Sequence, residues 1–172
     1  MKPRLMPDRG AAAESQPRVL AVASAGGHWI QLQRMAPAWD GCRVAYVTTV
    51  RGYESRVLAN AEARGQPRPD YHVVPDANRW QKFRLVMQLV MVAIVVLRVR
   101  PDAVITTGAA PGYFAIRVGA LMGARTIWVD SIANVDELSL SGRKAGRHAD
   151  LWLTQWQHLA EPGGPDYRGA VV

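Results

Sequence analysis

Short apolar runs, each about as long as a β-strand, constrain the fold of this chain more than any other feature. They cover residues 18–24, 42–49, 71–75, 102–108, 125–130 and 150–155. Their apolarity is continuous rather than alternating, which is typical of strands covered on both faces. Segments with helical character separate them, so we predict parallel βαβ units. The result would be a Rossmann-like α/β domain with a mostly parallel sheet of about six strands.

The length of the chain limits it to one such domain. At 172 residues, with 49% hydrophobic and 20% charged residues, it can bury one core but not two ordinary α/β domains. We expect a single domain over residues 18–172. Residues 1–17 lack the long apolar core of a secretory signal and are predicted to be a flexible tail. The single cysteine, Cys42, excludes a disulfide framework and a cysteine-based metal site, and it favours a cytosolic location.

The net charge points to anionic partners without choosing among them. Lys and Arg number 21 against 14 Asp and Glu, for a formal charge of +7. This surplus favours nucleic acid, acidic lipid or a phosphorylated substrate, because arginine suits bidentate phosphate contact. A compositional preference for arginine over lysine explains the surplus equally well.

The stretch "ASAGGHWIQL" at 23–32 follows the first predicted strand, where open parallel sheets usually bind ligands. Gly26 and Gly27 can adopt positive φ and let a phosphate or sugar approach the backbone at the start of a helix. The positive end of that helix disfavours imidazolium, so His28 is predicted to be neutral and to act as a general base. A tight turn whose histidine is satisfied by the backbone remains the alternative.

A second glycine turn, "TTGAAPGYFAI" at 106–116, follows another predicted strand. Gly108 and Gly112 would face the first turn across a cleft suited to a pyrophosphate, although glycine and proline often only punctuate a loop. The chain lacks the G-x-G-x-x-G fingerprint of dinucleotide binding and the G-K-[ST] of phosphate loops. Dehydrogenase and NTPase functions are therefore disfavoured, and we predict no cofactor and no metal.

The segment 79–100 contains a long apolar stretch between basic residues. Residues 85–97 span roughly 20 Å as a helix, which is less than the ~30 Å hydrocarbon thickness of a bilayer. The stretch can instead lie in the membrane interface with its basic flanks on anionic head groups. The alternative is a central helix packed between the sheet and a neighbour. The predicted membrane contacts are Arg79, Trp80, Lys82, Phe83 and Arg84.

Polar residues also gather near the end of the chain, in 128–162. Asp130 ends a predicted strand and is expected to point into the same cleft as His28, where it could bind a sugar hydroxyl or orient a catalytic group. Ser139, Ser141 and Arg143 form a candidate phosphate-binding cluster.

Together, "ASAGGHWIQL", "TTGAAPG", "WVDSIANVDELSLSGR" and "ADLWLTQWQHLAEP" resemble the Alg14-like family of polysaccharide-synthesis proteins, including the PssD type, over about residues 18 to 172. The resemblance implies the amino-terminal, acceptor-binding half of a GT-B architecture. The other half, which binds the UDP-sugar, would be a separate Alg13-like polypeptide. The implied substrate is a polyprenyl-diphosphate-linked saccharide at the cytoplasmic face of the inner membrane, bound peripherally, with no role for nucleic acid.

The resemblance also assigns residues. Gly26, Gly27 and His28 match the family's glycine-glycine-histidine loop, and Gly108 and Gly112 match its second glycine turn. Asp130 stands where many relatives have glutamate, so the carboxylate is kept with a shorter reach.

Three functions follow as hypotheses. The leading one is a subunit of an inverting glycosyltransferase, inactive without its partner, with His28 as base. The second is a non-catalytic membrane scaffold that recruits a transferase. The third is a Rossmann domain with unrelated small-molecule chemistry.

Overall fold

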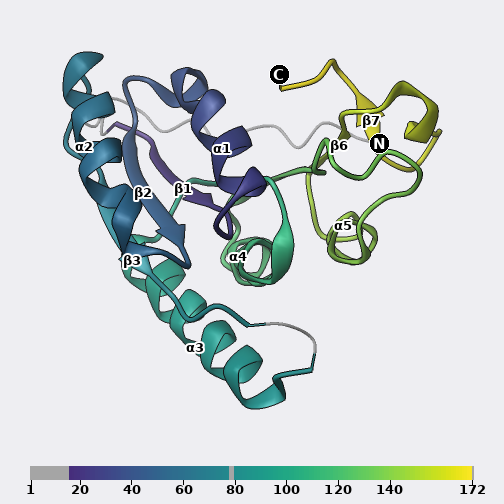
Figure 1. Ribbon diagram of the computed structural model, residues 1–172, viewed down its shortest axis with the longest axis horizontal. Coiled ribbons are helices and arrows are strands. Elements are labelled where there is room, and N and C mark those ends of the chain that lie inside the picture. Colours follow the sequence, from purple (N-terminus) through teal and green to yellow (C-terminus); the bar gives the residue numbers. More distant parts are fainter. Residues whose placement is uncertain (1–15, 78–79, 172) are drawn as a thin grey trace.

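The computed structural model describes residues 16–77 and 80–171, which form one sheet with helices on both faces (Figure 1). In these residues the sheet has seven strands in the order β3-β2-β1-β4-β5-β6-β7, and all neighbouring strands are parallel. The prediction of a Rossmann-like domain is thus confirmed. The strands are β1 Arg18–Val22, β2 Arg43–Thr48, β3 Asp70–Val73, β4 Ala103–Thr106, β5 Arg125–Val129, β6 Leu151–Thr154 and β7 Asp166–Tyr167.

Each predicted apolar run overlaps one observed strand, with β3 beginning one residue before its run, and β7 is the addition. Its two residues are exposed, and it pairs with β6 at the edge of the sheet. It lies in a stretch rich in glycine and proline that carries no apolar run, so it gave no strand signal. Most of the predicted tail, residues 1–15, lies outside the described residues.

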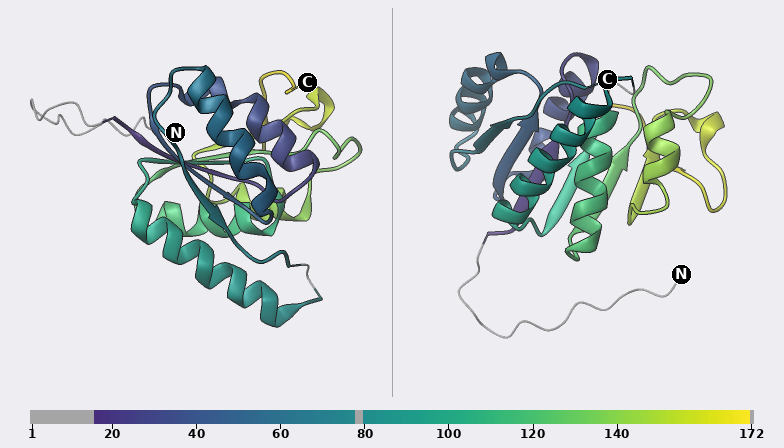
Figure 2. Two further views of the ribbon diagram at one scale, coloured as in Figure 1. Left: turned by 60° about the vertical axis from the view of Figure 1, so that its left-hand side comes forward. Right: turned by 90° about the horizontal axis from the view of Figure 1, so that it is seen from below.

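The helices cover the sheet in two layers, with α1 and α2 on one face and the other three on the opposite face (Figure 2). Short 3-10 turns at Ala36–Trp39, Arg51–Tyr53 and Gln157–Leu159 complete the described elements. The helices are α1 Gly27–Arg34, α2 Glu54–Ala63, α3 Lys82–Val99, α4 Ala109–Leu121 and α5 Leu140–Ala145.

Strand β1 shows why the apolar runs are continuous. Leu20 and Val22 pack into the core beneath α3 and α4, whereas Val19 and Ala21 pack into the core beneath α1. Successive side chains of a strand point to opposite faces, so a strand covered on both sides needs apolar residues at every position. The central position of β1 in the sheet therefore explains its sequence.

Helix α4 lies unusually close to the sheet. A Cβ atom at Gly112 would collide with the side chain of Thr106, and one at Gly119 would lie 2.7 Å from Val104 Cγ2. Both glycines are buried, and their missing side chains let α4 approach β4. Gly112 thus serves the close packing of α4 against β4.

Helix α3 has two apolar sides with different environments. Gln88, Val92, Val95 and Val96 are buried, and Val92, Val95 and Val96 belong to the core beneath α3 and α4. The opposite side is exposed, and we call it the α3 apolar face; it comprises Phe83, Val86, Val90, Ile94 and Leu97. The helix is therefore at the surface rather than enclosed between the sheet and a neighbour. In the described part of the chain, no helix has the length and apolarity needed to cross a bilayer.

Candidate active site

The order of the strands places a topological switch point beside β1, the position at which open α/β sheets have their ligand crevice. Strand β1 pairs with β2 on one side and with β4 on the other. The chain leaves β1 toward α1 on one face and leaves β4 toward α4 on the opposite face. Ligands of open α/β sheets bind at such switch points, outside the carboxyl ends of the strands. The two glycine-containing turns noted in the sequence are the turns that border this crevice.

The first turn is built for access to the backbone. Gly26 has φ 77° and precedes the first residue of α1, Gly27. A Cβ atom at either glycine would meet no other atom within 4 Å, so the space above this turn is open. The N–H groups in the first turn of a helix lack partners within the helix and favour anions. The start of α1 thus offers an approachable site for a negatively charged group.

The second turn, after β4, is strained. Gly108 has φ 128°, and Ala109 has φ 64°, which is uncommon for a residue with a side chain. The N–H of Gly108 donates to Thr106 Oγ1 at 3.1 Å, which holds the turn against its own strand. The observed strain lies next to the crevice.

His28 connects the two turns. Its Nδ1 lies 2.9 Å from the carbonyl oxygen of Thr107, and Thr107 Oγ1 donates to the carbonyl oxygen of His28 at 2.7 Å. The imidazole also occupies the space that a side chain at Gly108 would need, because a Cβ there would lie 2.9 Å from His28 Cε1. Gly108 therefore both adopts the positive φ of the turn and leaves room for the histidine ring.

This contact decides which ring nitrogen of His28 is basic. A carbonyl oxygen can only accept, so Nδ1 must carry a hydrogen. In the neutral imidazole, Nε2 then keeps its lone pair. Nε2 makes no hydrogen bond to any described residue, and the side chain is half-buried. The arrangement leaves an oriented proton acceptor at the crevice.

Asp130 is placed differently from the expectation that it would point into the cleft. Its carboxylate is buried and accepts from Ser139 N at 2.8 Å and from Ser139 Oγ at 2.6 Å. Asn134 Nδ2 and Trp128 Nε1 donate to it at longer distances of 3.3 and 3.4 Å. Both oxygens are thus used to hold the segment 131–139, and none of the bonds to described residues involves His28.

The candidate phosphate cluster near the end of the chain is also engaged locally. Ser139 caps α5, because its Oγ accepts from Gly142 N at 2.8 Å. Arg143 forms an ion pair with Glu137 at 3.0 Å. Ser141 is partly exposed. Of the sequence-predicted residues, the structure brings Gly26, Gly27, His28 and Gly108 together. The contacts described for Gly112, Asp130, Ser139 and Arg143 are made with residues outside this group.

Two buried glutamines that sequence reasoning missed hold α1 in place. Gln155 Nε2 donates to Gln31 Oε1 at 2.6 Å and to the carbonyl of Asp130 at 2.8 Å. Gln31 Nε2 donates to Ser131 Oγ at 3.1 Å. The only signal in the sequence was an amide between the apolar residues Trp29 and Leu32. Because Gln31 lies three residues after His28 on α1, this network helps to position the histidine.

An aromatic cluster anchors the other side of α1. Trp29 stacks on Tyr53 with ring centroids 5.3 Å apart and makes edge contacts with Tyr46 and Tyr71. Tyr71 donates to the carbonyl of Val50 at 2.5 Å. Burial, with a smaller contribution from the Glu54 carboxylate, raises the pKa of Tyr71 to about 12. These contacts keep the residue after His28 fixed against β2 and β3.

The predicted membrane contacts lie at the start of α3. Trp80 and Phe83 are 79% and 82% exposed, and Lys82 and Arg84 are exposed beside them. Arg79 lies outside the described residues. Among the described residues, no group of three or more histidine, cysteine, aspartate or glutamate side chains is arranged to hold a metal ion.

Solved structures with the same fold contain a second half that this chain does not match. MurG from Acinetobacter baumannii aligns with a TM-score of 0.68 at 15% identity, over 88% of this chain and 45% of that one. UDP-GlcNAc 2-epimerase from Neisseria meningitidis, bound to UDP-GlcNAc, aligns with a TM-score of 0.57 at 12% identity, over 82% of this chain and 41% of the epimerase. The chain spans less than half the length of either protein. These likenesses establish the fold, which is one half of a GT-B architecture.

Sequence comparison is more specific. The UDP-N-acetylglucosamine transferase subunit ALG14 of Yarrowia lipolytica is 26% identical over 188 residues, which cover 92% of this chain and 82% of that protein. The family model described as "Oligosaccharide biosynthesis protein Alg14 like" matches residues 20–170. The resemblance noted in the sequence is thereby confirmed, and the chain belongs to the Alg14-like family of oligosaccharide biosynthesis proteins.

Proposed function

We propose that this chain is the acceptor-binding subunit of a two-component inverting glycosyltransferase. The enzyme would transfer a sugar from a UDP-sugar to a saccharide linked to polyprenyl diphosphate. Two findings support this function: membership of the Alg14-like family, and a relative that is named as a subunit of a UDP-N-acetylglucosamine transferase. An Alg13-like polypeptide would supply the donor-binding half, since this chain covers only 45% of MurG.

The orientation of His28 carries the catalytic part of the proposal. Nδ1 is held by the carbonyl of Thr107, and Nε2 is left as a proton acceptor. In the reaction, Nε2 takes the proton of an acceptor hydroxyl while the hydroxyl oxygen attacks the anomeric carbon of the donor sugar. The bond between that carbon and the UDP oxygen breaks, UDP leaves with the bonding electrons, and the configuration inverts. The proton remains on His28 until it passes to solvent.

The turn before α1 is the proposed site for the acceptor's diphosphate. The space around Gly26 and Gly27 is open, and the helix start favours an anion there. Asp130 acts in this proposal by holding the segment 131–139 beside the crevice, rather than by touching the substrate. Ser139 and Arg143 support the same segment.

The α3 apolar face is the proposed membrane contact, at the cytoplasmic side of the membrane. Phe83 is 82% exposed between the exposed basic residues Lys82 and Arg84. Such a surface suits insertion of apolar side chains between anionic head groups. The binding would be peripheral, with the helix lying along the interface.

The membrane contact can be tested by flotation with lipid vesicles. The double substitution Phe83→Gln and Val90→Gln should strongly reduce the bound fraction, because it removes two large exposed apolar side chains from the α3 apolar face. Leu140→Gln, at a 56% exposed position on α5, is the matched control and should leave binding unchanged. Equal binding of the double variant and the wild type would contradict this contact.

The function itself is tested by reconstitution. The chain is purified with its Alg13-like partner and assayed on a lipid-diphosphate acceptor with a panel of UDP-sugars, omitting each polypeptide in turn. We expect transfer only when both are present. Full transfer by the partner alone to a soluble, short-chain acceptor would identify this chain as a scaffold. Transfer by this chain alone would contradict the two-component proposal.

A further inference from the structure

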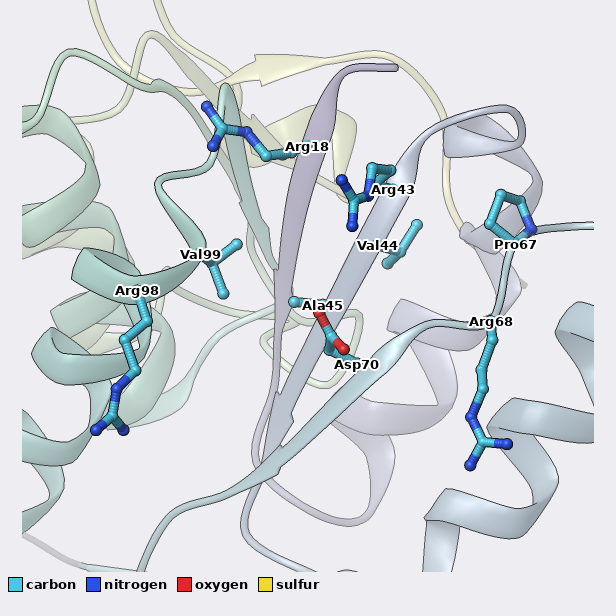
Figure 3. Close-up of a pocket in the computed structure, with 9 residues that line it drawn as sticks. All are labelled: Arg18, Arg43, Val44, Ala45, Pro67, Arg68, Asp70, Arg98 and Val99. Atoms are coloured by element: carbon cyan, nitrogen blue, oxygen red, sulfur yellow. The ribbon is translucent and has the colours of Figure 1, made fainter. Parts of the chain in front are cut away.

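A polar cavity lies at the amino ends of the strands, whereas His28 follows the carboxyl end of β1. The cavity has a volume of about 300 Å³ and sits where β1, β2 and β3 begin, next to the last turn of α3 (Figure 3). Arg18, Arg43, Arg68, Arg98 and Asp70 contribute its charged side chains, and smaller apolar side chains line the rest. The amino ends of the strands play no part in the proposed transfer reaction, so this cavity needs its own explanation.

The strand register brings the arginines together. Arg18 of β1 and Arg43 of β2 are direct partners in the parallel pair. Partners in register have side chains on the same face of the sheet. Each alternates with a residue that packs on the α1 side, Val19 or Val44, so both arginines belong to the face that α3 covers. Arg98, in the last turn of α3, lines the same cavity, with its guanidinium group directed away from the two strands (Figure 3).

The positive charge of the cavity is only partly neutralised. Arg18 pairs with Asp102, with its Nε 3.5 Å from Oδ2. Among the described residues, Arg43, Arg68 and Arg98 form no ion pair, and Asp70 supplies the single carboxylate of the lining. Four arginines lining one cavity raise the local potential and attract an anion. An anionic ligand would therefore complete the cavity.

We propose that this cavity binds a phosphate group, presented as a phosphate ester or as the head group of an anionic lipid. Arginine offers paired N–H donors that match phosphate oxygens. The volume lies at the lower end of the range for ligand pockets, which suits a small head group rather than a whole nucleotide. The site is separate from the proposed acceptor site, because the two lie at opposite ends of the parallel strands.

A lipid source is favoured by the neighbouring surface. Leu97, the last residue of the α3 apolar face, is 55% exposed and directly precedes Arg98. If α3 lies on the membrane, the cavity is close to the lipid head groups. This source rests on the membrane contact proposed above, whereas binding of a soluble phosphate compound does not.

The soluble arm of the test titrates the full chain with sodium pyrophosphate by isothermal calorimetry. The double variant Arg43→Ala and Arg98→Ala should bind about tenfold or more weakly, because it removes two of the four arginines that line the cavity. Arg34→Ala with Arg56→Ala removes the same charge from exposed positions on α1 and α2 and should bind within about twofold of the wild type, since exposed charges at a distance are screened. Asp70→Asn should bind more tightly, a gain that misfolding cannot produce.

The membrane arm measures flotation with vesicles of phosphatidylcholine, with and without phosphatidylglycerol. If phosphatidylglycerol gives an increment in the vesicle-bound fraction of the wild type but not in that of the Arg43/Arg98 variant, and pyrophosphate does not bind, the ligand is a lipid head group. Pyrophosphate binding that depends on these arginines, without that increment, assigns a soluble phosphate ester. If neither ligand depends on Arg43 and Arg98 more than on Arg34 and Arg56, the proposal is overturned.

The two proposals fail in different ways. Loss of the α3 apolar face would abolish binding to both kinds of vesicle, whereas loss of the cavity would remove only the increment due to anionic lipid. Pyrophosphate titration and transferase activity are also independent measurements. A negative result for the cavity therefore leaves the proposed transferase function standing, and the reverse is equally true.

Discussion

His28 follows the carboxyl end of β1, and Asp130 follows the carboxyl end of β5. Among the described residues, the two side chains differ in which of their polar atoms remain without a hydrogen bond. One ring nitrogen of His28 is hydrogen-bonded to the carbonyl of Thr107, and the other makes no hydrogen bond to a described residue. Both carboxylate oxygens of Asp130 accept hydrogen bonds from Ser139, and Asn134 and Trp128 are further donors. One side chain is oriented and still available, while the other is fully engaged.

This difference separates a candidate for chemistry from a candidate for structure. A general base must be held in place and still reach a substrate proton, which requires one satisfied and one open position. A buried carboxylate with several donors instead stabilises the segment that supplies them. Substitutions at the two positions should therefore affect different measurements, and the predictions below test that separation in order of decreasing effect.

The largest effect is expected for His28→Ala. It should lower kcat of the reconstituted enzyme by about 10²–10⁴-fold, the usual range for loss of a general base. Its melting temperature and its association with the partner should change little. His158→Ala is the control, because His158 is exposed and its contacts, with the carbonyl of Val135 and the ring of Trp156, do not involve His28. Undiminished turnover would remove His28 from the mechanism.

Asp130→Ala should instead reduce stability. Removing the carboxylate leaves Ser139 N and Ser139 Oγ without their partner, at a cost of about 2–4 kcal/mol in the free energy of unfolding. Urea denaturation measures this loss, and Asp136→Ala at an exposed position of the same segment is the control. If Asp130→Ala kept full stability but abolished transfer, Asp130 would act on the substrate and the contrast with His28 would be broken.

Gly108→Ala combines backbone strain with displacement of the His28 ring. The positive φ and the collision with His28 should together cost about 2–3 kcal/mol, and transfer should fall because the imidazole must move. Gly123→Ala is the control for a positive φ without a collision, since Gly123 has φ 79° and open space around its Cβ position. Equal activity of the two variants would show that the ring position is unimportant.

The smallest effect is expected for Gln155→Leu. The substitution leaves Gln31 Oε1 without one of its donors and the N–H of Val171 without its acceptor, at a cost of about 1–2 kcal/mol. Because α1 is also anchored by Trp29, transfer should decrease only slightly. The exposed Gln157→Leu is the control. A fall in kcat as large as that of His28→Ala would mean that the glutamine network, rather than Thr107, determines the position of the base.

Much of the fold could be predicted because it depends on local patterns. Strand β1 needs apolar residues at every position, and that need is visible in its sequence. Strand β7 has only two exposed residues and depends on pairing with β6, which no local pattern indicates. The sequence of α3 is apolar on two sides, so composition alone could not distinguish the packed side from the exposed one.

The candidate site divides in the same way. The glycines and His28 were recognisable because they lie at the end of the first strand, where the fold places ligands. The tautomer of His28 depends on Thr107, which is 79 residues away in the sequence. Likewise, Asp130 could be placed at a strand end, but its engagement depends on a loop that folds back through Ser139. Contacts of this kind arise only when the chain is folded.

The bond between His28 and Thr107 is made to a main-chain carbonyl, an atom that every amino acid would supply at position 107. Replacing the threonine side chain would remove the hydrogen bond from its hydroxyl to the carbonyl oxygen of His28. It would not change which ring nitrogen of His28 carries the hydrogen. A base whose tautomer is dictated by the backbone tolerates remodelling of its neighbour. The side chain at position 107 can therefore vary without changing which nitrogen of His28 accepts a proton.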